Sequence, residues 1–363
     1  MSENNEVAGS MAADKPRRRV RYRGTHPRRF HEKYKELSPD RYSADVEKVI
    51  ASGKTPAGMH RPVCVKEILE VLSPKPGETA VDCTLGFGGH ATELLKALQP
   101  GGRLVALDVD PIEIMKAEAR LRLPGLPDGS LVVRRMNFAG LASFLAQEEV
   151  DGADLILADL GLSSMQIDNP ARGFTFKVEG PLDLRMNPSR GRSAAELLES
   201  ASETDLARLL IENSDEPSAK VLAHAIVEAQ RRAPVRTTTR LAHVIRTALL
   251  PRSGSRRTDE IDTSIRRVFQ ALRIAVNDEF GALDTFLRNL PLCLKPGGRV
   301  AILSFHSGED RRVKKAFLAG HREGFYTKIS DEVIRPGEEE VRSNPRASSA
   351  KLRWAIRSLS GTR

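Results

Sequence analysis

A glycine-rich turn between an apolar strand and a helix constrains the fold of this chain more than any other feature. Residues 79–110 read TAVDCTLGFGGHATELLKALQPGGRLVALDVD, in which the strand ends at Asp82 and the turn GFGG occupies residues 86–89. Glycines at this place let the backbone approach a ligand at the N-terminus of the following helix. The next strand ends in Asp108, whose carboxylate can accept hydrogen bonds from both hydroxyls of a ribose. The stretch therefore predicts a site for a nucleotide-like cofactor.

Short apolar runs alternate with helical patterns on both sides of a long helical stretch. The runs are nearly continuous, as expected of strands buried on both faces of a parallel sheet. Strands are predicted over residues 79–83, 103–107, 130–134, 154–158, 299–304, 325–329 and 351–357, and helices over residues 65–72, 269–287 and 310–318. After Asp159, three amphipathic stripes replace the alternation. We expect an α/β fold with seven strands, in which residues 56–167 and 271–363 form one domain and residues 168–270 an inserted all-helical domain.

Two classes of enzyme share a glycine turn followed by an acid after the second strand. One class is the NAD-dependent dehydrogenases, and the other is the methyltransferases that use S-adenosylmethionine. The turn here is G-x-G-G rather than the three-glycine dinucleotide pattern. In addition, Asp82 precedes it where a methyltransferase would engage the amino-acid part of its cofactor. Both features favour a methyltransferase over a dehydrogenase or a purely structural turn.

Two later strand ends carry residues that fit the same site. The third strand is followed by Asn137-Phe138, where Phe138 can pack against an adenine or belong to the core. The fourth strand ends in Asp159-Leu160-Gly161-Leu162-Ser163-Ser164-Met165-Gln166. In a doubly wound sheet the ligand crevice lies at the carboxyl ends of the strands, so we expect Asp159 to face the ligand.

The charge balance fits an enzyme that acts on a polyanion, although solubility alone accounts for it equally well. The 363 residues include 57 Lys+Arg and 48 Asp+Glu, a formal net charge of +9. Residues 1–55 are polar with a basic cluster, and we expect a disordered arm that either holds RNA phosphates or is merely solvated. No apolar run reaches the length of a membrane span, and the N-terminus lacks the apolar core of a secretory signal. Three isolated cysteines predict neither a disulfide nor a metal site, so we expect a cytoplasmic protein without a metal.

Ordered motifs over about residues 58–357 resemble one known family, the bacterial MraW-type methyltransferases. The motifs are His60-Arg61-Pro62-Val63, the turn from Asp82 to His90, Leu107-Asp108-Val109-Asp110-Pro111, Asp159-Leu160-Gly161 with Ser163-Ser164, Arg172-Gly173-Phe174, Gly180-Pro181-Leu182-Asp183-Leu184-Arg185-Met186, Phe269-Gln270-Ala271-Leu272-Arg273-Ile274, Ser304-Phe305-His306-Ser307, and Asn344-Pro345-Arg346-Ala347. So many matches in the same order make coincidence a poor explanation.

The resemblance implies a fold, a reaction and a set of cofactor-binding residues. The fold is a seven-stranded class I (Rossmann-like) methyltransferase sheet, with the helical insertion shaping an RNA-binding cleft. The reaction is methylation, by S-adenosylmethionine, of the N4 amine of a cytidine in the decoding region of small-subunit (16S-type) ribosomal RNA. The residues that the resemblance implies around the methyl donor are Gly88, Gly89, His90, Asp108, Phe138, Asp159 and Gln166.

The chemistry of this reaction suggests further candidate residues. The N4 amine is a poor nucleophile because its lone pair is conjugated into the ring, so alignment with the methyl group is essential. A carboxylate that accepts from the amino hydrogens would assist, and Asp159 is the candidate acceptor. His306 and Asp183 are candidates for holding the cytidine. Their alternative interpretations are a loop anchor for His306 and a structural ion pair with Arg185 for Asp183.

Four arginines are candidate ligands of RNA phosphates. They are Arg172, Arg185, Arg266 and Arg267. The expected partner is small-subunit ribosomal RNA, either free or in the assembled subunit. The sequence leaves the oligomeric state open, a homodimer included. It also leaves a DNA amino-methyltransferase and, more remotely, a dinucleotide-dependent oxidoreductase or a non-catalytic RNA-binding module as alternatives.

Three segments depart from the pattern of the family. Residues 83–88 read CTLGFG, where the family usually has a Gly before the Thr and an Arg before the Gly pair. Residues 263–267 read TSIRR in place of HPATR, and residues 213–216 lack a usual Tyr-Gly. We expect these changes to alter local RNA contacts more than cofactor binding.

Overall fold

The computed structural model describes residues 62–122, 126–250 and 258–359. These ranges belong to one compact unit, Gly58–Arg363. The basic arm expected over residues 1–55 lies outside the described residues. No helix in the described part of the chain is both long and apolar enough to cross a membrane.

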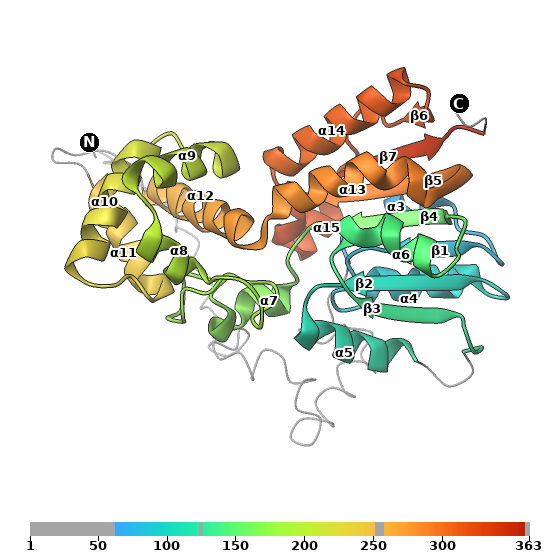
Figure 1. Ribbon diagram of the computed structural model, residues 1–363, viewed down its shortest axis with the longest axis horizontal. Coiled ribbons are helices and arrows are strands. Elements are labelled where there is room, and N and C mark those ends of the chain that lie inside the picture. The colour runs from blue at the N-terminus through green and yellow to red at the C-terminus, as the bar shows by residue number, and fades with distance from the viewer. Residues whose placement is uncertain (1–61, 123–125, 251–257, 360–363) are drawn as a thin grey trace, which may run out of the picture. The chain divides into compact units, whose positions relative to one another are not determined.

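Seven strands form one sheet in the order β3-β2-β1-β4-β5-β7-β6 (Figure 1). The strands are β1 (Thr79–Asp82), β2 (Arg103–Asp108), β3 (Leu131–Arg135), β4 (Ala153–Asp159), β5 (Leu294–Ser304), β6 (Tyr326–Ile329) and β7 (Lys351–Arg357). Neighbours among β1 to β5 pair in parallel, whereas β7 is antiparallel to both β5 and β6. The predicted α/β fold with seven strands is confirmed. Only β5 differs clearly from its predicted range, because Leu294 already pairs with Ala153 of β4 ahead of the Pro-Gly-Gly turn.

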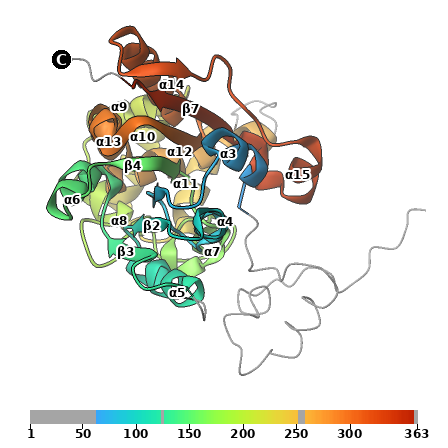
Figure 2. The ribbon, with the colours of Figure 1, turned by 90° about the vertical axis from the view of Figure 1, so that its right-hand side faces the viewer.

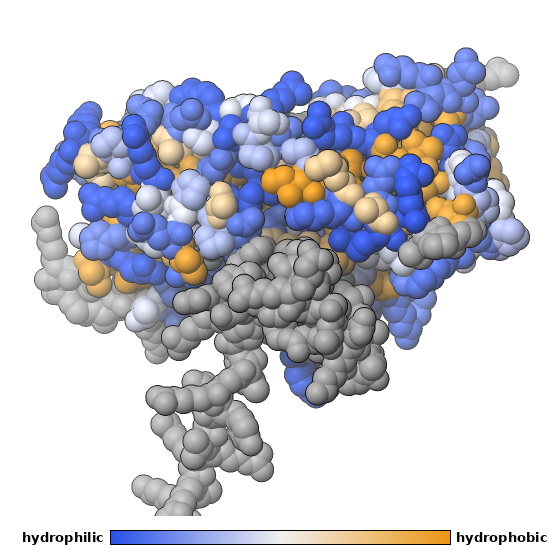
Figure 3. Space-filling view, turned by 90° about the horizontal axis from the view of Figure 1, so that it is seen from below, coloured by the Kyte–Doolittle hydropathy of each residue, from blue (hydrophilic) through white to orange (hydrophobic). Residues whose placement is uncertain are grey.

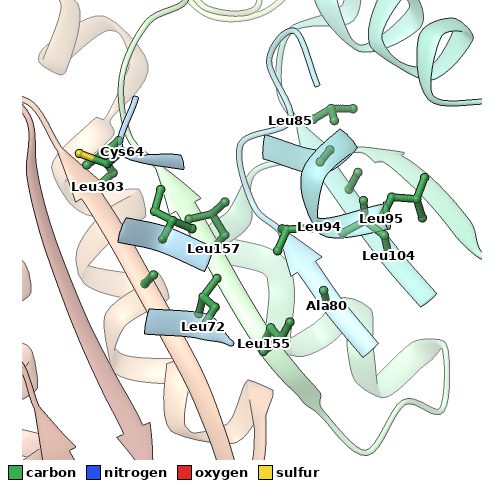
Figure 4. Close-up of a cluster of buried hydrophobic side chains, with 14 of the residues drawn as sticks. Cys64, Leu72, Ala80, Leu85, Leu94, Leu95, Leu104, Leu155, Leu157 and Leu303 are labelled. Atoms are coloured by element: carbon green, nitrogen blue, oxygen red, sulfur yellow. The ribbon is translucent and has the colours of Figure 1, made fainter. Parts of the chain in front are cut away.

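Helices cover both faces of the sheet and enclose a separate apolar core on each. On one face lie α3 (Val65–Leu72), α4 (Gly89–Leu98) and α5 (Pro111–Leu121), and Figure 4 shows their core, which includes Leu72, Leu94 and Leu157. On the other lie α6 (Leu141–Gln147), α13 (Glu279–Cys293) and α14 (Ser307–Arg322), which bury Phe286 and Phe317. Each such side chain contributes roughly 1.5–3 kcal/mol of hydrophobic stabilisation. Packing on both faces explains why the strand sequences are continuously apolar.

A short C-terminal helix, α15 (Glu338–Ser343), lies beside α3 (Figure 2). Its Glu340 Oε1 accepts a hydrogen bond of 3.0 Å from the backbone N–H of Cys64, the residue that precedes α3. This bond occupies a backbone donor that a helix N-terminus leaves without an intrahelical partner. The segment before β7 is thereby fastened to the start of the sheet domain.

The insertion is helical, with a core of its own. It contains α7 (Ser164–Asp168), α8 (Ala194–Ser200), α9 (Glu203–Ser214), α10 (Ala219–Arg232), α11 (Thr238–Leu249) and α12 (Thr258–Asn277). Figure 1 shows α8 to α12 grouped on one side of the sheet. Their buried residues form one cluster that includes Leu210, Leu222, Ile245 and Leu272. The amphipathic stripes read from the sequence face this cluster.

The long helix predicted over residues 269–287 is divided into α12 and α13. Asp278, between them, has φ 49°, which ends the helical path. The side chain of Asn277 supports the break, because its Nδ2 donates to Leu184 O at 2.8 Å and to Arg273 O at 2.9 Å. Leu272, two residues beyond the predicted boundary at residue 270, packs in the same cluster as the helices of the insertion.

The surface gives little sign of a large apolar face. The face seen in Figure 3 is mostly hydrophilic, and its apolar residues gather in small groups. Groups of this kind are ordinary on the surface of a globular protein and carry no argument for a partner.

Candidate active site

A cavity of about 830 Å³ lies at the carboxyl ends of the parallel strands. Its wall combines the turn after β1, the ends of β2 and β4, the loop after β5 and the insertion helix α12. Ligand sites in sheets of this type lie at such strand ends, with volumes of roughly 300–1,000 Å³. The residues expected around a cofactor all line the cavity, except Gly88.

The glycine turn brings backbone close to the cavity. Gly88 precedes α4 with φ 86°, a left-handed conformation that favours glycine. A Cβ on Gly89 would lie 2.9 Å from Pro62 Cγ, so a larger residue would collide with the chain that precedes α3. These two positions explain why the turn needs glycine at both residues.

Asp108 closes the opposite side of the turn. Its Oδ2 accepts from the backbone N–H of Gly86 at 2.6 Å, and its Oδ1 accepts from that of Asp110 at 2.8 Å. Burial raises the pKa of this carboxyl to about 6, although these backbone bonds act in the opposite direction. A carboxylate offers about four acceptor sites, and the backbone N–H groups do not use all of them, so Asp108 can still accept from a hydroxyl group of a ligand.

His90 lies between two carboxyl groups at the start of α4. Its side chain is 8% exposed, and Nε2 lies 3.5 Å from Asp159 Oδ2 without forming a hydrogen bond within the described residues. Asp82 is buried behind the turn and does not line the cavity, contrary to the role expected for it. Its Oδ1 accepts from Thr84 N at 3.1 Å, and burial raises the pKa of Asp82 to about 6. The Asp159 carboxylate, 23% exposed, is therefore the acidic group on this side that reaches the cavity.

Phe138 and Gln166 line the cavity in different ways. Phe138 is partly buried, and its ring meets that of Phe286 edge to face at 5.3 Å, which leaves the residue both part of the core and part of the cavity wall. The Gln166 amide is held at both ends: Nε2 donates to Asp110 Oδ2 at 2.8 Å, and Oε1 accepts from Ser163 N at 2.9 Å. Gln166 thus shapes the wall with a fixed orientation.

Three polar residues expected at the site lie at the start of the insertion, away from the cavity wall. Arg172 is buried, and its Nη1 donates to Asp110 Oδ2 at 2.8 Å while its Nη2 donates to the backbone oxygens of residues 185 and 186. Arg185 forms a two-pronged ion pair with Asp183, with distances of 2.7 and 2.9 Å. Neither Asp183, Arg185 nor Arg172 lines the cavity. These groups are bonded to one another or to backbone, so the structure does not bring them to the cavity wall. The contact of Asp183 with Arg185 agrees with the structural ion pair that the sequence offered as the alternative interpretation.

The remaining two arginines lie on α12 and differ in position. Arg266 is exposed and lines the cavity, as expected for a residue that meets an extended ligand. Arg267 does not line it, and its Nη1 lies 4.0 Å from Glu216 Oε2. Arg266 is therefore the better candidate of the pair for contact with a phosphate.

His306 lies on the cavity wall at the start of α14. Its Nδ1 accepts from the backbone N–H of Glu309 at 3.4 Å, and its Nε2 lies 3.0 Å from Glu309 Oε1. With Nδ1 accepting, the hydrogen of a neutral ring resides on Nε2, which forms no hydrogen bond within the described residues. This arrangement fits the interpretation of His306 as a loop anchor better than that of a proton acceptor.

An ion pair between Arg273 and Glu279 lies on the cavity wall, and the sequence analysis predicted no role for it. Arg273 and Glu279 both line the cavity, and the guanidinium meets the carboxylate at 2.8 Å through both Nε and Nη2. Arg273 lies within the motif from Phe269 to Ile274, which contributed to the family resemblance but did not indicate a function for the arginine.

The segments that depart from the family pattern have structural partners. The Ser264 hydroxyl of α12 donates to Glu216 Oε1 at 3.1 Å, so the departing segments at residues 213–216 and 263–267 meet in a buried contact. At the turn, the Arg120 guanidinium lies 3.4 Å from the centre of the Phe87 ring and donates to Phe87 O at 2.6 Å. An arginine from α5 therefore stands beside the position where the family usually has one.

Comparison with known proteins agrees with this geometry. The model of the MraW methylase family matches residues 57–358. "Ribosomal RNA small subunit methyltransferase H 2" of Alkaliphilus metalliredigens is 53% identical over 345 residues, which cover 95% of this chain and 98% of that protein. "Ribosomal RNA small subunit methyltransferase H 1" of Lachnoclostridium phytofermentans is 52% identical over 342 residues, covering 94% of this chain and 93% of that protein. With a match along nearly its whole described length, the chain belongs to the MraW methylase family.

Proposed function

We propose that this methyltransferase transfers the methyl group of S-adenosylmethionine to the N4 amine of a cytidine in the decoding region of small-subunit ribosomal RNA. One observation carries the proposal: a single cavity joins the glycine turn and Asp108 on the sheet side to Asp159 and the insertion helix α12. A donor and a large acceptor can therefore meet in one cavity. Membership of the MraW methylase family and the names of its relatives support the choice of reaction and substrate.

The donor fits the sheet side of the cavity. Two features support this fit: the close backbone approach at Gly89, and the Asp108 carboxylate with its spare lone pairs. In our proposal Asp108 accepts from the ribose hydroxyls, Phe138 packs against the adenine, and the turn with His90 holds the amino-acid end. When bound, S-adenosylmethionine supplies an electrophilic methyl group on a positively charged sulfur.

Asp159 is the proposed acceptor of the proton that the reaction releases. The N4 lone pair forms a bond to the methyl carbon as the methyl–sulfur bond breaks, and the electron pair of that bond stays on sulfur. The N4 amine then carries an extra proton, which passes to the Asp159 carboxylate and on to solvent. The backbone N–H of Gly161 donates to Asp159 Oδ1 at 3.3 Å and orients this carboxylate. His90 Nε2 lies 3.5 Å from Asp159 Oδ2, and His306 anchors the adjacent loop.

Alignment supplies most of the expected rate acceleration. The target base must leave its stack to enter the cavity, because N4 is otherwise engaged within folded RNA. Arg266, exposed at the cavity wall, is the proposed contact for a phosphate next to the target base. The proposed compartment is the cytoplasm, where the proposed substrate is made.

Two measurements test the proposal. Calorimetric titration with S-adenosylmethionine should give a single saturable site, and titration with NAD⁺ should give no heat of binding. Transfer of labelled methyl groups should reach small ribosomal subunits that lack the modification, or their isolated RNA, but not duplex DNA. Binding of NAD⁺ in place of S-adenosylmethionine would reject the reaction class, and labelling of DNA alone would reject the substrate.

A further inference from the structure

We propose that Arg273 recognises the target base as cytosine, by donating hydrogen bonds from its free edge to N3 and O2 of the ring. This inference rests on the proposed function, because it names a specificity-determining residue for that reaction. It concerns a part of the cavity that holds no expected donor contact: the wall formed by α12 and the start of α13.

The guanidinium of Arg273 is held in one orientation. Its Nε donates to Glu279 Oε1 and its Nη2 to Glu279 Oε2, both at 2.8 Å. The two side chains are only 16% and 11% exposed, so the pair is shielded from the screening that weakens surface ion pairs. A bidentate contact of this kind fixes the plane of the guanidinium as well as its position.

The Glu279 contact leaves one edge of the guanidinium unused. A guanidinium has five N–H donors, and a bidentate pair through Nε and Nη2 employs two of them. No acceptor in the described residues forms a hydrogen bond to Arg273 Nη1, although the residue lines the cavity. The edge made by Nη1 and the second hydrogen of Nη2 is therefore available to a ligand.

The surroundings suit a flat aromatic ligand. Phe269 lies four residues before Arg273 on α12, hence on the same face of the helix. Its ring lies 5.5 Å from that of Phe176, and both residues line the cavity together with Phe174. Bases that leave a stack are commonly received on aromatic side chains, so this wall can receive an extruded base.

The hydrogen-bonding pattern of cytosine matches the free edge of Arg273. Cytosine presents two adjacent acceptors, N3 and O2, next to the N4 amine. A guanidinium fork meets such paired acceptors with two donors, as arginine does with guanine N7 and O6 in nucleic-acid complexes. Uracil has an N–H at position 3, which would face the guanidinium donor to donor and leave buried hydrogens unpaired.

Carboxylate groups near Arg273 on the cavity wall would complement the N4 amine of the base. Glu279, His306 and Glu309 have ligand atoms within 4.8 Å of one another on the cavity wall. Glu309 Oε2 accepts from Phe305 N at 2.9 Å, so that carboxylate is partly committed to the loop. The positive charge of Arg273 is thus accompanied by the negative charges of Glu279 and Glu309. This balance favours binding of a neutral base, which has both donors and acceptors, over binding of a phosphate.

The experiment compares binding of subunits that differ only at the target base. Small ribosomal subunits with cytidine or uridine at that position compete for the enzyme in the presence of S-adenosylhomocysteine, which prevents transfer. The wild-type enzyme should prefer cytidine by about tenfold or more. In Arg273→Lys, which keeps the charge but not the fork, the preference should fall below about threefold while affinity for S-adenosylmethionine is unchanged.

A matched variant separates base recognition from general RNA binding. Arg266→Ala removes a cation from the same helix and the same cavity, and it should weaken binding of both subunits by a similar factor. Glu279→Gln, which retains a hydrogen-bonding group but loses the charge, should lower the cytidine preference as the fork loosens. If Arg273→Lys unfolds, as seen by circular dichroism, Arg273→Gln takes its place.

The outcomes distinguish this inference from the proposed function. A wild-type enzyme that binds both subunits equally, or an Arg273 variant that folds and keeps the wild-type preference, would overturn the role of Arg273. Failure of the wild-type enzyme to methylate N4 of the cytidine would instead reject the proposed function.

Discussion

Arg172 Nη1 lies 2.8 Å from Asp110 Oδ2, and this buried ion pair joins the start of the insertion to the loop after β2. The side chains are 7% and 0% exposed. Asp110 is also the N-cap of α5, with Oδ1 accepting from the backbone N–H groups of residues 112 and 113. One carboxylate therefore fixes a helix of the sheet domain and a loop of the insertion at the same time.

Removal of Arg172 should destabilise the protein strongly. Arg172→Ala leaves the Asp110 charge buried with fewer partners, and loss of one member of a buried pair costs about 3–5 kcal/mol. The measurement is the free energy of unfolding from urea titration monitored by circular dichroism. Arg208→Ala is the control, because its 3.0 Å ion pair with Asp205 is largely exposed and should contribute no more than about 1 kcal/mol. Equal stability of the two variants would show that the Asp110 contact has no special role.

Donor binding should weaken as the pH falls below about 6. Burial raises the pKa of Asp108 to about 6, and the ionised carboxylate is the form that accepts from ribose hydroxyls. Bound hydroxyl groups would lower that pKa, so binding at acidic pH must expel a proton and loses affinity. Asp108→Asn should reduce affinity for S-adenosylmethionine at pH 7.5 by about tenfold or more and flatten its pH dependence.

The same raised pKa has a separate effect on stability. Between about pH 4 and pH 6 the folded protein keeps a proton on Asp108 that the unfolded chain has lost. This carboxyl therefore lowers the free energy of unfolding as the pH rises through that window.

The prediction for donor binding is tested by calorimetric titrations of the folded Asp108→Asn variant with S-adenosylmethionine at several pH values. An affinity at pH 7.5 equal to that of the wild-type enzyme would exclude Asp108 as a ribose ligand.

Most of the fold could be predicted because strand and helix patterns are local. The ends of β1 and β4 lie within one residue of prediction, since continuous apolar runs mark strands buried on both faces. The break at Asp278 could not be predicted in this way. It depends on Asn277, whose amide bonds to Leu184 O, a partner that sequence periodicity does not identify.

The site residues likewise differ in how far local sequence could predict them. Gly89 and Asp108 follow from a turn and a strand end that lie close in sequence, so their places in the cavity were predictable. The Asp110 partner of Arg172 was not, because an arginine near a site can serve a phosphate or a carboxylate equally well. For Asp183, the sequence left the ion pair with Arg185 open as one of two interpretations. The structure gives both of them carboxylate–guanidinium contacts within the protein. Resemblance to a family marked these residues as important without stating for which purpose.

Asp159 and His306 should differ in their effect on catalysis. Asp159→Asn removes the proposed proton acceptor and should lower kcat by about 10²–10⁴-fold, with affinities for donor and RNA changed by less than about threefold. His306→Ala removes the N-cap of α14 and should lower stability by about 1 kcal/mol, with a smaller loss of kcat. Single-turnover rates with saturating substrates provide the comparison. A larger loss in His306→Ala than in Asp159→Asn would make His306 the proton acceptor.

The basic N-terminal segment should contribute to RNA affinity through phosphate contacts. Deletion of residues 2–30 should reduce affinity for the RNA at low salt and reduce the slope of log affinity against log salt, because fewer counterions are released. Binding of S-adenosylmethionine should be unchanged. An identical salt slope with and without the segment would show that it makes no phosphate contacts.

Nucleoside mass spectrometry tests the central claim most directly. Small ribosomal subunits that lack the modification, or their isolated RNA, are incubated with the enzyme and S-adenosylmethionine, and the RNA is digested to nucleosides. The account predicts N4-methylcytidine at one cytidine of the decoding region, in lower yield when Asp108→Asn replaces the wild-type enzyme at limiting donor. Methyladenosine, cytidine methylated on a ring carbon, or no methylated nucleoside at all would contradict it.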